Sequence, residues 1–444
     1  MAERQPNEGL SRLLAEADWT LGQLATAVNR AGEEAGVGVR CDKSNVSHWL
    51  SGTKPMEKVR PLLQEALSRR LGRHVTYAEL GFPAPKNAST SLSGIEGLVD
   101  LGRADMDPSR RSVLSAGLYS VALTIPGWPD VVARAEAVKK GRGLRYGFSE
   151  VDMVVQMTEK ISDIDDQFGG RTARPMAATF LVNTVAPYLR ADAPEDVRKA
   201  MLSAASDLCY LTGYMAVDER LHGLAQKYYL KALELAGAAE DHLTYCTTLR
   251  GMSVQAVDLG HGKRAMDLAD AAAAASPKAG PRMLAFLAGQ QAHSAAQIGD
   301  RTTALRRMKE AEAAMDQAES RGKIFGSYDP AALHYHIAQV RNELGDATGS
   351  VDAMKMSNRL RHSHYRRTAV RFHAILAERQ MKTGHLEEAI VSWNRCLDDY
   401  PMVHSGRADE RFEVMRQLIR PHLRNHKATE LYERSQHMKP MKSS

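Results

Sequence analysis

The chain has four cysteines among 444 residues, no long hydrophobic run and no run of alternating β-branched residues. The cysteines are isolated, so the pattern indicates neither a zinc site nor a disulfide framework and fits a reduced compartment. The apolar run from Ala116 to Ile125 follows an arginine pair that superficially resembles an export signal, but it stops at Pro126 and is too short to span a bilayer. The N-terminus also lacks the apolar core of a signal peptide. We therefore expect a cytoplasmic protein without membrane contact.

Motifs that carry enzyme chemistry are missing as well. No glycine-rich phosphate loop follows a strand pattern, and neither a nucleophile elbow nor an HExxH sequence is present. The histidine pairs at 362 and 364 and at 334 and 336 have no carboxylate or cysteine that completes a ligand set. The sequence predicts no enzymatic activity, no cofactor and no metal.

The composition is that of a globular, all-α protein with more than one domain. Hydrophobic residues make up 43% and charged residues 25% of the chain, and most segments are rich in Ala, Leu, Met and Arg with a helical period. A stretch rich in Pro, Ala, Ser and Asn after Phe82 predicts a linker over 86–108, which separates a domain at 1–85 from the rest. A helical connecting region is expected at 109–200, with helices at 112–124, 129–140, 149–166 and 173–190. Phe168 to Arg171 is interpreted as a helix break.

A repeat begins near residue 201. Gly260, Gly299, Gly345 and Gly384 each precede a small residue by five positions, and successive glycines lie 39, 46 and 39 residues apart. An earlier copy around Ala225 lacks the turn glycine. This pattern is typical of tetratricopeptide repeats, in which glycine turns the chain between two helices and small residues let them cross closely. We expect a superhelix over 201–404 and a helical cap and tail over 405–444.

Such a superhelix has a concave inner face. Matching positions between the repeats predicts a mixed aromatic, amide and charged inner face that would hold a peptide, small-molecule or protein ligand. Its members are Tyr210, Tyr214, Arg250, Asp258, His293, Gln297, Tyr335, Gln339, Asn342, Arg371 and Glu378. Packing between neighbouring repeats is the alternative role for these side chains. A basic run from Lys355 to Lys382 would attract DNA or an acidic peptide, or form a solvated helix face.

The segment from Asp42 to Pro55 predicts a short amphipathic helix in the first domain. Asp42 is a good N-cap, Val46 and Trp49 share one face with Leu50, and Gly52 with Pro55 ends the helix. Short polar or cationic side chains that suit base edges and phosphates point away from that face. They are Lys43, Ser44, Asn45, Ser47 and His48.

Neighbouring features favour a helix-turn-helix at this place. A preceding segment, capped by Thr20, carries an apolar stripe at Leu21, Leu24, Ala25 and Val28. Between residues 40 and 73 the chain has eight basic and three acidic residues, so positive charge is concentrated where phosphates would lie. Arg40 and Lys54 flank the predicted helix and are expected to contact the DNA backbone.

The two parts together resemble actinobacterial regulators that join an Xre/Cro-type helix-turn-helix to a tetratricopeptide-repeat body, including the NsdA-like negative regulators. The residues that carry the resemblance are Val46 to Pro55, Leu62 to Gly72, Phe168 to Arg171 with Val185 to Pro187, and Gly223 to Leu233. A more distant likeness is to peptide-sensing quorum regulators of Gram-positive bacteria. One departure is the segment from Asn29 to Arg40, because a compact Xre domain has only a few residues there. The extra residues lengthen the second helix or add a loop, so the docking angle on DNA does not follow from that of compact relatives.

This resemblance implies a transcription regulator, a repressor of differentiation or secondary metabolism genes, that binds double-stranded DNA as a homodimer. The repeats would mediate dimerisation and ligand sensing. The alternative is a protein-interaction scaffold that uses the repeats to bind a partner protein, without sequence-specific DNA binding.

Overall fold

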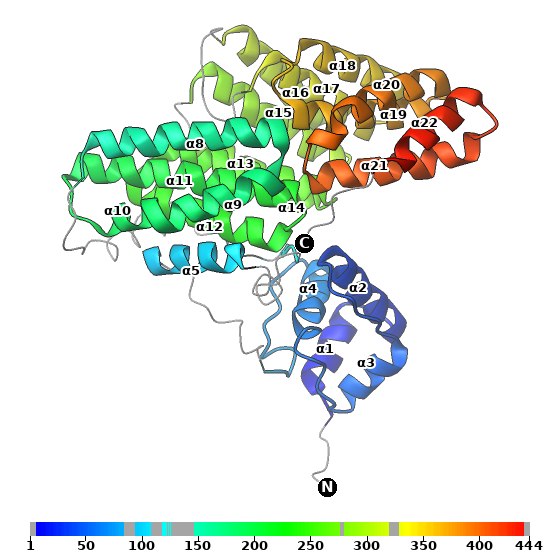
Figure 1. Ribbon diagram of the computed structural model, residues 1–444. Helices are drawn as coiled ribbons and strands as arrows, with labels where there is room; N and C mark the ends of the chain where they lie inside the picture. The colour runs from blue at the N-terminus through cyan, green and yellow to red at the C-terminus, as the bar shows by residue number, and fades with distance from the viewer. Residues whose placement is uncertain are drawn as a thin grey trace.

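The computed structural model describes residues 6–83, 94–107, 118–121, 123, 125, 146–275, 279–318 and 328–438. All regular secondary structure in these residues is helical, as the composition predicted. A small domain at the N-terminus lies beside a much larger body of stacked helices (Figure 1). None of the described helices is long and apolar enough to cross a membrane.

The N-terminal domain contains four helices around one apolar core. They are α1 (Glu8–Glu16), α2 (Leu21–Glu34), α3 (Lys43–Leu50) and α4 (Arg60–Leu71). Leu10, Leu24 and Leu63 are fully buried in the core, and each such side chain contributes about 1.5–3 kcal/mol of hydrophobic stabilisation. The Asn7 side chain caps α1 through Leu10 N and donates to Leu80 O at 2.9 Å. The first and last parts of the domain are thereby joined.

The predicted linker over 86–108 is wrong over half of its length, because residues 94–106 form helix α5 (Gly94–Met106). Leu98, Val99 and Leu101 are buried against the body. Asp105 forms a buried ion pair with Arg174 and accepts a hydrogen bond from the Tyr228 hydroxyl at 2.9 Å. The apolar spacing of α5 was a helical signal, but the neighbouring Pro and Ser residues hid it.

The connecting region supplies the first helices of the body. Helix α8 (Phe148–Phe168) confirms the helix expected at 149–166, and α9 (Gly170–Phe180), a π-helical turn η2 (Leu181–Val185) and α10 (Ala186–Arg190) occupy 170–190. Gly169 separates α8 from α9 with φ of +91°, which confirms the predicted break. The helix expected at 112–124 is wrong for residues 118–121 and 123, which are not helical; its other residues and the helix at 129–140 lie outside the described ranges.

Helical hairpins then follow one another to the end of the described chain. The pairs are α11 (Glu195–Asp218) with α12 (His222–Ala239), α13 (His242–Asp258) with α14 (Gly262–Ala275), α15 (Pro281–Gln297) with α16 (Arg301–Asp316), α17 (Pro330–Glu343) with α18 (Ala347–Leu360), α19 (Arg366–Lys382) with α20 (Leu386–Asp399), and α21 (Gly406–Ile419) with α22 (His426–Gln436). Two 3₁₀ turns, η3 (Tyr400–Met402) and η4 (Arg420–His422), follow α20 and α21. This is the predicted tetratricopeptide-like superhelix.

The repeat signature has a direct structural cause. The turn glycines at 260, 299, 345 and 384 have φ between +78° and +86°, a region that glycine adopts without steric cost. The small residue five positions later is fully buried in each hairpin, as with Ala265 and Ser350. In the first hairpin Arg220 takes the same turn at φ of +64°, which explains why that copy lacks a glycine.

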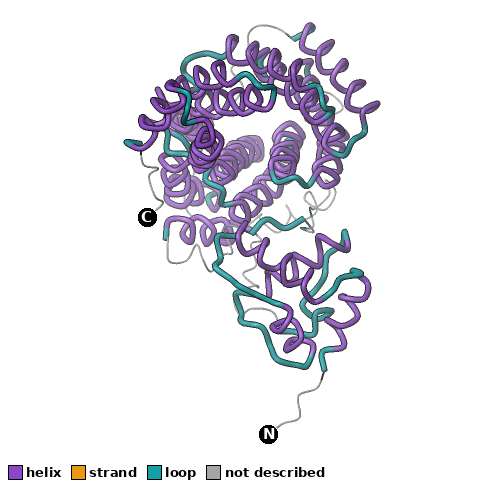
Figure 2. Tube along the Cα trace, turned by 90° about the vertical axis from the view of Figure 1, so that its right-hand side faces the viewer, coloured by secondary structure: helices purple, strands orange, loops and turns teal. Residues whose placement is uncertain are grey.

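The helices of the body follow one another around a ring (Figure 2), and hydrogen bonds join its last part to its first. His404 N donates to Phe168 O at 2.7 Å, and Arg171 N donates to His404 O at 3.1 Å. Ser405 Oγ donates to the Asp218 carboxylate at 2.8 Å. The residues just before α21 therefore contact the helix break at Gly169. The body is thus a closed ring rather than an open array.

Candidate functional site

Helix α3 is built as the sequence predicted. The Asp42 carboxylate accepts hydrogen bonds from Ser44 N and Asn45 N at 2.9 Å, while Val46 and Trp49 are buried in the domain core. Burial of these two residues turns the opposite face of the helix outward. Helices α2 and α3 pack against each other.

The outward face of α3 is polar and cationic. Lys43, Ser44, Ser47 and His48 are exposed, and so are Arg40 before the helix and Lys54 after it. No ion pair joins Arg40, Lys43, His48 or Lys54 to any residue that the structure describes. These side chains are available to a partner, whereas Arg69 and Arg73, farther along the basic run, pair with acidic residues.

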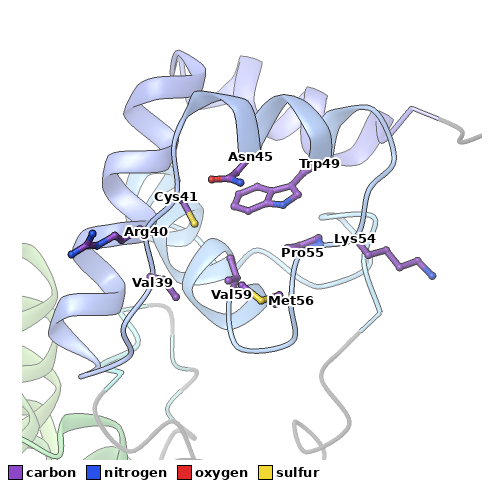
Figure 3. Close-up of a pocket in the computed structure, with 9 residues that line it drawn as sticks. All are labelled: Val39, Arg40, Cys41, Asn45, Trp49, Lys54, Pro55, Met56 and Val59. Carbon is purple, nitrogen blue, oxygen red and sulfur yellow. The ribbon is translucent and has the colours of Figure 1, made fainter.

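Asn45 differs from the other predicted contact residues. Its Oδ1 accepts a hydrogen bond from Asp42 N at 2.9 Å, which completes a capping box, and the side chain is half-buried. It also lines a cavity of about 180 Å³ together with Cys41, Trp49 and Met56 (Figure 3). Asn45 therefore holds the start of α3 in place, a role that removes much of its freedom to contact a base.

The segment from Asn29 to Arg40 produces both of its expected effects. Helix α2 extends to Glu34, and a loop then runs to Asp42. The Asn29 side chain holds this loop, since its amide donates to Cys41 O at 2.8 Å and its carbonyl oxygen accepts from Cys41 N at 2.7 Å. The loop ends next to α3, and Arg40 is exposed near its end.

The interior of the ring is organised around Asp258, at the end of α13. Its carboxylate pairs with Arg371 of α19 at 3.2 Å and with Arg407 of α21. Burial opposes ionisation of this carboxyl group, but the two guanidinium groups outweigh it and lower its pKa. Because these helices are distant in sequence, the ion pairs show that the first helix of each of these hairpins faces the ring interior.

A second ion cluster closes the ring beside the first. Arg367 of α19 pairs with Asp165 of α8 at 2.9 Å, with Asp166 at 3.1 Å and with Asp218 of α11 at 3.5 Å. The same guanidinium lies over the aromatic ring of Tyr214, with its carbon atom 5.3 Å from the centroid of that aromatic ring. Two parts of the chain about 200 residues apart are thus held together by charge.

The predicted inner-face residues fall into two groups. Tyr210, Arg250 and His293 are buried: Arg250 donates to the Tyr210 hydroxyl at 2.7 Å and lies 3.5 Å from the Phe286 ring centroid. Burial lowers the pKa of His293 to about 4. These three side chains pack between repeats, which is the alternative role considered for them.

The remaining residues of the predicted face stay half-exposed. They are Tyr214, Gln297, Tyr335, Gln339, Asn342, Arg371 and Glu378. Arg371 lies over the Tyr335 ring at 6.0 Å, and Gln339 donates to the Tyr335 hydroxyl at 3.0 Å. Gln297 instead donates to Val257 O at 2.8 Å, and Glu378 pairs with Arg411 at 2.8 Å. The structure brings Tyr335, Gln339 and Arg371 into one polar and aromatic cluster.

Position-matching missed Arg367 and Arg407, because their partners lie far away in sequence. Arg367 does belong to the basic run at 355–382, but much of that run is paired internally: Lys355 bonds Glu388 and Arg366 bonds Asp399, in addition to the ring contacts. The run is therefore not a free basic surface along its whole length.

Comparisons with known proteins match separate parts of this architecture. Residues 10–83, which nearly coincide with the N-terminal domain, match the family model described as the SP15 N-terminal domain. A search of curated proteins gave no match. Among solved structures, the chain is similar to one in the crystal structure of the APC/C hetero-tetramer Cut9-Hcn1, at 13% identity and a TM-score of 0.32. The alignment covers 92% of this chain and 62% of that chain.

Proposed function

We propose that the repeat body is a protein-interaction scaffold whose inner face receives a segment of a partner protein. The observation that carries this proposal is the half-exposed cluster of Tyr335, Gln339 and Arg371 next to the Asp258 ion pairs. Tyr335 already stacks on Phe372 and Arg371 already pairs with Asp258, so a bound peptide would contact the exposed edges of these side chains through further hydrogen bonds and apolar contact. Stacked helical hairpins commonly present such groups on their inner face.

Site-specific photocrosslinking tests this function. A photoreactive phenylalanine analogue at Asn342, half-exposed on α17, is compared with the same analogue at Lys309, which is exposed on α16. In extract of the source cells, a discrete protein adduct is expected from position 342 alone. The adduct should weaken when Arg371→Gln is added. Equal adducts from both positions would contradict an inner-face site.

A second function is favoured by the exposed face of α3. We propose that the N-terminal domain binds double-stranded DNA, with Ser47 and His48 at base edges and Arg40, Lys43 and Lys54 at phosphates. The support is three cationic side chains without ion-pair partners among the described residues, placed around one helix whose other face is buried. One such helix contacts few bases, so specific binding would need a homodimer with two half-sites. The chain would then be a regulator of the Xre type, as the sequence resemblance implied.

Fluorescence anisotropy with DNA from upstream of its own gene tests this second function. A Ser47→Ala, His48→Ala double variant is expected to lose at least tenfold in affinity for the preferred DNA and little for unrelated DNA. Both residues are exposed, so the fold should not change. Asn45 is unsuitable for the test because it caps α3. An unchanged affinity in the double variant would exclude α3 as the DNA contact. A chain that sediments as a monomer both with and without DNA would exclude the homodimer.

A further inference from the structure

A short non-helical segment runs between the N-terminal domain and the ring. This bridging segment comprises Leu118 to Val121 together with Leu123. Leu118 packs against the core of the N-terminal domain, and Tyr119 is buried in the core of the ring. Adjacent side chains that point in opposite directions are the pattern of an extended chain.

The ring side of the contact binds the backbone of this segment. Gln226 of α12 is buried, and its side-chain amide makes two hydrogen bonds to Ser120: the oxygen accepts from Ser120 N and the nitrogen donates to Ser120 O, both at 2.8 Å. Arg264 of α14 donates to Leu123 O at 2.7 Å. Gln226 thus pairs with one residue as a neighbouring β-strand would, which is how a protein binds an extended peptide.

The domain side supplies two more bonds from α4. Arg69 donates to Tyr119 O at 2.9 Å, and the Glu65 carboxylate accepts from Val121 N at 2.8 Å. Glu65 is only 4% exposed and also pairs with Arg69 at 2.8 Å. A buried carboxylate is costly unless its hydrogen bonds are satisfied. The bridging segment provides one of the bonds that this glutamate needs.

One side chain of the segment is recognised specifically. The Tyr119 ring stacks on His261 with centroids 5.2 Å apart and planes within 8°. His261 lies in the turn between α13 and α14, and burial lowers its pKa to about 4, so the imidazole is neutral and stacks as an aromatic ring. The contacts therefore select an extended backbone with one aromatic side chain.

We propose that α4, α12 and α14 with His261 form a binding site for an extended peptide, and that this site is occupied by the chain's own bridging segment. Occupation joins the N-terminal domain to the outer helices of the ring and sets the position of α3 relative to the ring. Because the segment is covalently attached, its effective concentration is high and a free copy competes poorly. Weakening the attached segment opens the site to a free peptide.

Peptide binding to the full-length chain tests the site without any use of DNA. The probe is a fluorescent peptide with the sequence of Leu118 to Ile125, extended by two lysines for solubility. We expect it to bind Tyr119→Ala at least tenfold more tightly than the unmodified chain. This gain in peptide affinity should disappear in the double variant that combines Tyr119→Ala with Gln226→Ala. It should also disappear when the tyrosine of the peptide is replaced by alanine. Binding to Tyr119→Ala that is no tighter than to the unmodified chain would overturn the proposal.

A distance measurement keeps the test decisive if Tyr119→Ala folds poorly. Spin labels at Ser44 and Lys309, both exposed, report the separation of α3 from α16. Gln226→Ala should broaden the distance distribution. The matched control is Asn394→Ala, which also removes a side-chain amide bonded to a backbone carbonyl but lies on α20; it should leave the distribution unchanged. Identical distributions in Gln226→Ala and the unmodified chain would also overturn the proposal.

Discussion

The two domains use the same kind of residue in opposite ways. In the N-terminal domain Arg40, Lys43 and Lys54 extend into solvent around α3, whereas in the ring Arg367, Arg371 and Arg407 are held by aspartates from distant helices. Exposed cations contribute little to stability and remain available to a partner. Buried guanidinium groups hold the ring closed and become costly when their partners are removed. Net charge alone therefore does not distinguish a binding surface from a structural contact.

The largest effect is expected from removing the central acid of the ring. Asp258→Ala leaves Arg371 and Arg407 without their shared partner. Loss of one member of a fully buried ion pair costs about 3–5 kcal/mol, so about 3 kcal/mol is expected for these partly buried groups. The urea midpoint should fall accordingly, with Arg40→Gln as a control that changes stability by less than about 0.5 kcal/mol. Similar midpoints for the two variants would show that the Asp258 pairs do not stabilise the ring.

Gly169→Ala should disturb ring closure more locally. Gly169 has φ of +91°, and a Cβ atom there would lie 2.5 Å from His404 O. Strain and the lost contact should cost roughly 2 kcal/mol. Hydrogen exchange should increase for residues 168–171 and 404–406 while α1–α4 keep their protection. Unchanged exchange at both ends would contradict the role of this contact, and Gly36→Ala in the N-terminal domain serves as a control for a positive-φ glycine with no neighbour.

A smaller effect is expected from the free cations of the N-terminal domain. Lys43→Gln with Lys54→Gln removes two proposed phosphate contacts, which should lower the slope of log affinity against log salt by about two and leave sequence preference intact. The measurement is anisotropy over a series of salt concentrations. The same change at Lys355, which pairs with Glu388, should leave the slope unaltered. An equal change in slope from Lys355→Gln would place DNA contact on the ring.

The smallest effect concerns acid sensitivity of the ring. Burial lowers the pKa of His293 to about 4 from an ordinary 6.5, with Asp258 opposing the shift and Arg379 and Arg371 adding to it. The folded chain keeps this imidazole neutral while the unfolded chain protonates it, so its contribution to stability falls as pH drops from 6.5 towards 4. Between pH 7 and pH 5 the free energy of unfolding should fall for the unmodified chain. In His293→Gln this fall should be smaller by about 1–2 kcal/mol, as measured by urea unfolding at the two pH values. Parallel losses would mean that His293 is accessible to protons in the ring.

Local features of this chain could be predicted because their causes lie within a few residues. Asp42 caps α3 and Val46 and Trp49 bury its inner face, while the turn glycines with their small partners define the hairpins. One error was also local in origin, since α5 was hidden by the polar residues before it.

Sequence alone determined the all-helical fold, the two domains, the hairpin repeat and the polar face of α3, since helical period, caps and turns are properties of neighbouring residues. Only the tertiary structure decided that the superhelix closes, that Tyr210, Arg250 and His293 are buried, and that the segment at Tyr119 joins the domains. These outcomes depend on pairs such as Asp258 with Arg407, which lie 149 residues apart. The rotation of each hairpin relative to the one before it accumulates along the chain and decides which distant charged residues form ion pairs. A local sequence pattern does not predict that rotation.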